Sequence, residues 1–143
     1  MKKLMMVFVL ALMTFVLTGC GTETLNCTMS QTQTGMTMNQ EMNATFVNNE
    51  VTKMDIKINA ELDETYATAM DQIKASIEEN LKQYKENGGK VEVSSEGNTV
   101  EANVSLDLSK MSKDQKKALK MTDVYGTKSA TLKELEKQGY TCK

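Results

Sequence analysis

Strict alternation of apolar and polar side chains over two successive segments is the feature that most constrains the fold of this chain. In residues 36–46 the even positions hold methionine, glutamine, alanine and phenylalanine, whereas the odd positions hold threonine, asparagine and glutamate. Residues 52–60 continue the pattern after a turn at Asn48-Asn49-Glu50. Successive side chains of a strand point to opposite faces of a sheet, so this period of two predicts strands with one apolar and one wet face.

Three further segments extend the predicted sheet. A weaker strand around residues 25–29 is followed by a turn near Thr34-Gly35. Two more strands, residues 91–93 and 100–108, flank a turn at Glu96-Gly97-Asn98. We therefore expect about five strands, largely antiparallel, with one face of the sheet left to water.

A long amphipathic helix is predicted between the third and fourth strands, over residues 64–86. Asp63 precedes it as a candidate N-cap, and Gly88-Gly89 ends it. Its apolar positions recur every three or four residues and form one stripe: Tyr66, Met70, Ile73, Ile77, Leu81 and Tyr84. At 1.5 Å per residue such a helix is about 34 Å long, enough to cover the apolar side of the sheet from end to end.

Two short helices complete the predicted fold. Ser112 and Gln115 have the spacing of a capping box. Thr131 and Glu134 repeat that spacing, and Gly139 ends the second helix. The predicted fold class is α+β in the order β-β-β-α-β-β-α-α, with the long helix packed on the apolar face of the sheet.

The N-terminal segment has the pattern of a bacterial lipoprotein signal peptide. Met1-Lys2-Lys3 is followed by the apolar run 4–16, which is short for a bilayer span, and then by Leu17-Thr18-Gly19-Cys20. We expect residues 1–19 to be removed and Cys20 to carry a lipid. Residues 20–26 would then form a tether and residues 27–143 a single domain. The expected location is the outer face of the bacterial cytoplasmic membrane.

The other two cysteines lie near the two ends of the predicted domain. Cys27 and Cys142 form an even pair in an oxidising compartment, which predicts a disulfide. Closing so long a loop stabilises a fold by roughly 4–5 kcal/mol in the chain-entropy model. The alternative is a pair of free thiols, either buried or redox-active, although no Cys-x-x-Cys spacing supports the redox version.

Composition narrows the classes of function. A formal net charge of −2 argues against nucleic acid as a partner. The chain has no histidine, and no Gly-x-Ser-x-Gly elbow or P-loop is present, so we expect no catalytic residues and no cofactor. Every basic residue is a lysine, and with the many asparagines and methionines this suggests a low-GC, Gram-positive source.

A run of lysines marks the first short helix as a candidate contact with the membrane or an anionic wall polymer. Beside Lys110, its members are Lys113, Lys116, Lys117 and Lys120. Near an acidic membrane each lysine is worth about 1 kcal/mol. The alternative is an ordinary solvated helix face.

Two other patterns could mark metal or catalytic sites. Met29, Met36, Met38 and Met42 have the thioethers that suit Cu(I). However, Met36, Met38 and Met42 fall on the alternating apolar face, where methionine packs as core under the helix. The acidic groups Glu61-Asp63-Glu64 and Glu78-Glu79 are explained by a helix cap and an exposed helix face, rather than by a carboxylate pair or a calcium site. We expect no metal.

The chain resembles the YehR-like bacterial lipoproteins, also known as domain-of-unknown-function family 1307. The resemblance rests on the signal-peptide motif, the strand at Cys27-Thr28-Met29, the long central helix and the strand pair 91–108. It also rests on the ending Thr131-Leu132-Lys133-Glu134-Leu135-Glu136 with Gly139-Tyr140. It implies an α+β fold and a surface location, and it transfers no activity or site. The two cysteine positions are similar to those of Gram-positive members.

We therefore expect a monomeric, non-enzymatic, lipid-anchored surface protein that acts as a binding or accessory module near the membrane. Its expected partners are the membrane, through the lipid on Cys20, and an envelope protein or anionic polymer. Two alternatives are a lipoprotein that captures a small solute and a carboxylate-dependent envelope enzyme.

Overall fold

The computed structural model describes residues 21–143 and builds them around one antiparallel sheet. Its strands are β1 (Thr22–Gln33), β2 (Met36–Val47), β3 (Glu50–Leu62), β4 (Lys90–Glu96), β5 (Thr99–Asp107) and β6 (Thr141–Cys142). The order across the sheet is β4-β5-β3-β2-β1-β6, and every neighbouring pair is antiparallel. The predicted α+β class and the antiparallel sheet are confirmed. The predicted signal peptide and the predicted lipidation site Cys20 lie outside the described residues.

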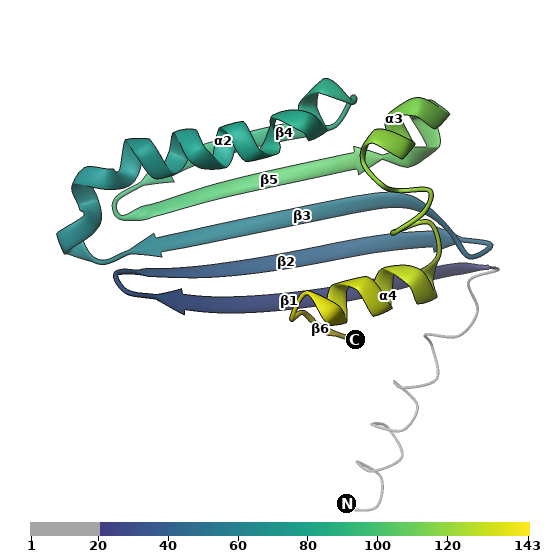
Figure 1. Cartoon of the computed structure of the whole chain (residues 1–143), viewed down its shortest axis with the longest axis horizontal. Helices are drawn as coiled ribbons and strands as arrows, with labels where there is room; N and C mark the ends of the chain where they lie inside the picture. Colours follow the sequence, from purple (N-terminus) through teal and green to yellow (C-terminus); the bar gives the residue numbers. More distant parts are fainter. Residues whose placement is uncertain (1–20) are drawn as a thin grey trace, which may run out of the picture.

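The helices all pack on one face of this sheet (Figure 1). They are the 3-10 turn η1 (Glu64–Ala69), α2 (Met70–Glu86), the turn η2 (Leu108–Lys110), α3 (Lys113–Ala118) and α4 (Lys128–Lys137). Between helices and sheet lies the core, whose largest fully buried side chains include Phe46, Met54, Leu62, Leu106 and Leu135. The alternation in β2, β3 and β5 therefore produces one buried face and one face open to solvent.

The sheet has one strand more than expected. Thr141 and Cys142 pair with Thr28 and Cys27 of β1, and the two cysteines are joined by a disulfide. A strand of two residues is too short to show an alternation pattern, so the periodicity of the sequence could not reveal it. The disulfide itself was predicted, and it secures this edge of the sheet.

The first strand begins earlier than the predicted domain. Residues 22–26, which we expected to belong to a lipid-anchored tether, are paired with β2 from Thr22 opposite Val47 to Asn26 opposite Asn43. Leu25 is buried in the core. The boundary between tether and domain at residue 27 is therefore wrong, because the polar residues Thr22 to Thr24 extend the strand beyond its apolar part.

The long helix covers less of the sheet than expected. Residues 64–69 form a 3-10 turn without a side-chain cap from Asp63, and only 70–86 are α-helical. α2 lies over β4 and β5, where Ile77 and Leu81 are buried, whereas α4 covers part of β1 (Figure 1). A helix is about 10 Å wide and neighbouring strands are about 4.8 Å apart, so one helix covers about two strands. It cannot cover a sheet of six strands.

The two short helices begin with different caps. Ser112 and Gln115 form the predicted capping box of α3. α4 instead begins after Thr127, whose side chain accepts a hydrogen bond from the backbone of Ala130. The expected cap Thr131 is fully buried within α4 and donates to the carbonyl of Tyr125 at 3.1 Å, so that expectation is wrong.

Candidate functional surfaces

One end of the sheet brings the residue after Cys20 together with the lysine helix. The carbonyl of Gly21 accepts a hydrogen bond of 2.8 Å from the backbone N–H of Asn48, in the β2–β3 turn. β5 also finishes at this end, with Asp107 opposite Lys53, and leads directly into η2 and α3 (Figure 1). We call this the proximal end, defined by Gly21, the turn at Asn48-Asn49 and α3.

The segment that carries α3 is held firmly against the sheet. Leu119 and Met121 are buried beneath it, at 5% and 3% exposure. Further along, the carbonyl of Gly126 accepts a hydrogen bond of 3.2 Å from the N–H of Val51 at the start of β3. The position of the lysine helix relative to Gly21 is therefore set by the core.

The predicted lysine contacts share one surface at the proximal end. Lys113, Lys116 and Lys117 are spaced three and four residues apart, which places them on one side of the helix. Lys113, Lys117 and Lys120 are exposed and Lys116 is half-buried. None of the ion pairs found among residues 21–143 includes these four lysines. By contrast, Lys110 pairs with Asp107 at 2.8 Å and Lys128 with Glu23 at 3.5 Å.

The Asp107–Lys110 pair also sets the charge state beside α3. The Lys110 ammonium and the Ser109 hydroxyl hold the pKa of the Asp107 carboxyl below its ordinary value. The same pairing raises the pKa of Lys110. Both groups therefore stay ionised at neutral pH and cancel one another. Among the described residues, the cations outside the ion pairs of this end are then Lys90, beside Lys110 and Gln115, and the four lysines on and after α3.

The opposite end of the sheet is acidic. It is formed by the β1–β2, β3–η1 and β4–β5 turns, which are joined by hydrogen bonds from Asp63 N–H to the Gly35 carbonyl and from Leu62 N–H to the Asn98 carbonyl, both 2.9 Å. Its carboxylates are Glu61, Asp63, Glu64, Asp71 and Glu96, and its segments 31–37, 60–71 and 94–100 contain no lysine. We call it the distal end.

The open face of the sheet carries polar side chains that bind one another. Ser105 donates to Asp55 at 2.6 Å, Lys53 lies 2.9 Å from the same carboxylate, and Asn59 donates to Glu101 at 3.3 Å. A shallow depression of about 340 Å³ crosses the middle of this face, with Glu41, Lys57 and Glu92 on its walls.

The carboxylates of this face are held in their ionised form. Hydrogen bonds from Asn43 and Asn26 lower the pKa of Glu41. Burial alone would raise the pKa of Asp55, but the Ser105 hydroxyl and the Lys53 ammonium outweigh it and lower that pKa. Carboxylates with a lowered pKa stay ionised and suit hydrogen bonds and ion pairs that stabilise the sheet, whereas a general acid needs a raised pKa.

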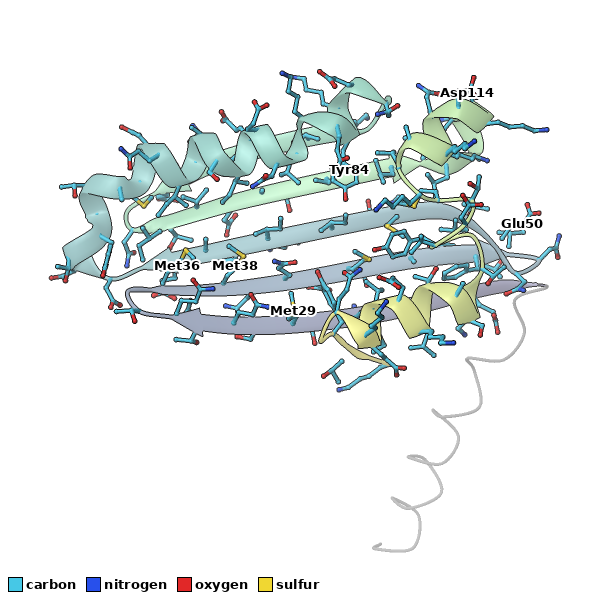
Figure 2. The ribbon with its side chains drawn as sticks, viewed as in Figure 1. Met29, Met36, Met38, Glu50, Tyr84 and Asp114 are labelled. Atoms are coloured by element: carbon cyan, nitrogen blue, oxygen red, sulfur yellow. A yellow bond between two sulfur atoms is a disulfide. The ribbon has the colours of Figure 1, made fainter. Side chains whose placement is uncertain are left out.

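Two of the three methionines expected under the helix lie, with Met29, on an uncovered part of the apolar face. Met42 is buried, but Met29, Met36 and Met38 are only partly buried, because α2 lies over β4 and β5 rather than over β2 (Figure 2). The expectation that the helix covers Met36 and Met38 is therefore wrong, whereas Met42 is buried as expected. A polar residue, Gln40, continues this row.

Gln40 connects the methionine row to the C-terminal segment. The hydroxyl of Tyr140 donates to Oε1 of Gln40 at 2.5 Å, and the Gln40 amide donates to Sδ of Met38 at 3.2 Å. Met29 pairs with Gln40 and Met38 with Gln31, so the thioethers follow one another along the strands rather than converging on one point. The row is therefore an adaptable apolar strip.

Residues 21–143 offer neither a metal cluster nor a membrane-spanning helix. Within this range no group of three or more His, Cys, Asp or Glu side chains is placed to hold a metal ion. No helix of the described chain is long and apolar enough to span a bilayer. Of the acidic groups named in the sequence analysis, Glu78 and Glu79 are exposed on α2, where Glu79 lies 3.9 Å from Lys82.

The separation of charge between the two ends was not anticipated from the sequence. The acidic residues come from three segments, and only the strand topology brings those segments to one end of the sheet. The signal that was available is positional. Alternating strand directions put the turn predicted near residue 34 and the end of the third strand at the same end of the sheet, and the long helix then returns to the opposite end, so that the turn predicted near residue 97 falls beside them.

Comparison with solved structures supports the fold. No protein-family model and no curated protein matches the chain significantly. The NMR structure of YehR from E. coli superposes with a TM-score of 0.56 at 15% identity, covering 85% of this chain and 92% of that one. The NMR structure of a protein from Streptococcus pneumoniae TIGR4 gives 0.50 at 12% identity, with 85% of each chain covered. At these identities the similarity concerns the fold alone, so the chain has a YehR-like fold.

Proposed function

We propose that this protein is a non-enzymatic lipoprotein, anchored through Cys20 to the outer face of the cytoplasmic membrane, that serves as a binding or accessory module close to the bilayer. The observation that carries the proposal is the motif Leu17-Thr18-Gly19-Cys20 after a short apolar run. The hydrogen bond between Gly21 and Asn48 adds a spatial argument, since it leaves one residue between the lipidated cysteine and the first strand.

The surfaces of the domain favour binding over catalysis. Its polar sheet face pairs its own carboxylates with amides, hydroxyls and lysines, and its methionine row presents apolar side chains that adapt to different partners. The polar face spans the sheet, whereas the methionine row occupies the uncovered part of the apolar face beside Gln40. The polar face does place the Ser105 hydroxyl beside the Asp55 carboxylate, but Lys53 also binds that carboxylate and its pKa is lowered, so Asp55 is a poor base for activating a nucleophile.

The anchor is tested by growing the bacterium with a clickable fatty acid and analysing the N-terminal peptide of the protein by mass spectrometry. We expect a lipid adduct on Cys20 and loss of residues 1–19. The control is Cys20→Ala, which should remain unprocessed and unlabelled. A wild-type chain released without lipid would contradict the proposal.

The binding role is tested by crosslinking on intact cells, with the captured material compared between wild type and Cys20→Ala. A protein captured only by the anchored form would support an accessory role and identify its pathway. Capture of a small solute alone, with saturable binding to the purified protein, would instead favour the solute-capturing alternative.

A further inference from the structure

We propose that the proximal end of the domain rests on the membrane, with Lys113, Lys116, Lys117 and Lys120 against anionic phospholipid headgroups. The sheet then stands upright on the bilayer with its distal end outermost. This inference deepens the proposed function and rests on its lipid anchor at Cys20.

The first argument is that the chain between the anchor at Cys20 and the sheet is very short. β1 begins at Thr22, and the Gly21 carbonyl is already bound to Asn48. One residue spans at most about 3.6 Å of extended chain, so the proximal end lies within a few ångströms of the lipidated cysteine. A long linker would allow any face of the domain to meet the bilayer, whereas this connection selects the proximal end.

The second argument is the charge available at that end. Four lysines on and after α3 are free of ion pairs among the described residues, and three of them are exposed. The nearby carboxylates outside the pairs named above are Glu50, Glu86, Asp114 and Asp123; Figure 2 labels Glu50 and Asp114. Lysine ammonium groups on long flexible stems suit phosphate headgroups, because they act as point charges and need no fixed geometry.

The third argument comes from the distal end. β3 has 13 residues, so the acidic turns stand about 40 Å from the proximal end, several times the screening length of about 8 Å at physiological salt. In the upright position these carboxylates are outside the field of the membrane. If the domain lay flat, they would approach anionic headgroups and be repelled, so both ends favour the same orientation.

The test measures how fast each lysine is acetylated in the full lipoprotein reconstituted into vesicles. One set of vesicles contains phosphatidylcholine alone, and the other also contains phosphatidylglycerol. We expect acetylation of the four α3 lysines to slow about threefold to fivefold in the anionic vesicles. Lys57, Lys74 and Lys137, which lie away from the proximal end, should react equally in both. Raising the salt concentration should remove the difference.

Two matched triple variants sharpen the result. Lys113→Gln/Lys116→Gln/Lys117→Gln removes three charges from α3 and leaves Lys120 as the reporter. Lys57→Gln/Lys74→Gln/Lys137→Gln removes three charges that lie away from the proximal end. Protection of Lys120 in anionic vesicles should be lost in the first variant and kept in the second.

Equal acetylation of the α3 lysines in both kinds of vesicle would overturn the inference while leaving the anchor intact. Protection that arises in phosphatidylcholine vesicles only after soluble polyphosphate is added would also overturn it, in favour of a wall polymer. If Cys20 carries no lipid and the chain stays out of the vesicle fraction, the proposed function itself fails. Recovery with the vesicles is measured separately from acetylation, so the two failures are distinguishable.

Discussion

The ring of Tyr66 occupies the space in which a side chain at Gly35 would lie. A Cβ built on Gly35 would meet Cε2 of Tyr66 at 1.9 Å, and the backbone of Gly35 has a φ of +82°. Tyr66 was expected in the apolar stripe of the long helix, but it is 42% exposed and lies in η1, across the turn between β1 and β2. The distal end is therefore closed by a glycine–tyrosine contact.

Gly35→Ala should destabilise the fold through this contact as well as through its left-handed backbone. We expect a loss of about 2–3 kcal/mol in the free energy of unfolding, measured by urea denaturation. Gly97→Ala is the matched control, because Gly97 has a φ of +59° and a Cβ there would meet no atom within 4 Å, so it should lose only about 1 kcal/mol. In a Tyr66→Ala background the two substitutions should cost the same. If Gly35→Ala still cost more than Gly97→Ala in that background, the clash with the Tyr66 ring would not be the cause of the extra loss.

Removal of the disulfide should have a large effect on stability. The double substitution Cys27→Ala/Cys142→Ala frees β6 and relaxes the unfolded chain, and we expect a loss of about 2–5 kcal/mol. The urea midpoint, compared with that of the oxidised wild type, measures it. A change below about 1 kcal/mol would show that β6 and α4 are held without the bridge.

Aspartate substitutions at the two isoleucines of α2 should have different effects on stability. Ile77 is 8% exposed and Ile73 is only partly buried, so Ile77→Asp places an unpaired carboxylate in the core whereas Ile73→Asp leaves it a route to water. We expect Ile77→Asp to unfold the domain and Ile73→Asp to fold with reduced stability, as seen by circular dichroism. A folded Ile77→Asp protein would mean that α2 does not pack on β4 and β5 in solution.

Stability should fall in acid partly because of Asp55. The folded pKa of this carboxyl is lowered from its ordinary value of 3.8, so its contribution is present above pH 4 and is lost as the pH falls through the folded pKa. Unfolding measured from pH 7 to pH 2 should show a shallower acid loss in Asp55→Asn than in wild type. Asp123→Asn, at an exposed turn position, is the control and should follow the wild-type curve.

Local patterns were sufficient to predict the class of the fold. The alternation in residues 36–46 and 52–60 located two strands, and the spacing of Ile77 and Leu81 located the buried side of the helix. These predictions succeed because burial on one face imposes a period that the sequence itself displays. The disulfide was also predictable from the sequence, since only two cysteines remain in the domain.

The arrangement of helices over the sheet was not predictable in the same way. Met36 and Met38 have the same pattern as Met42, yet only Met42 is buried, because burial depends on where α2 crosses the sheet. Likewise, Thr131 and Glu134 have the spacing of a cap, but Thr127 caps the helix. The candidate lysine contacts were visible as a run of charge, whereas their position beside Gly21 required the strand order.

The disulfide also determines how the domain bears mechanical load. Because Cys142 is bonded to Cys27, tension applied between Gly21 and the C-terminus passes only through residues 21–27 and the sulfur–sulfur bond. The remaining strands lie outside this path. A partner that grips the last residues would therefore pull directly on the proposed anchor, and the sheet would stay folded under a force that would unravel it if the bridge were absent.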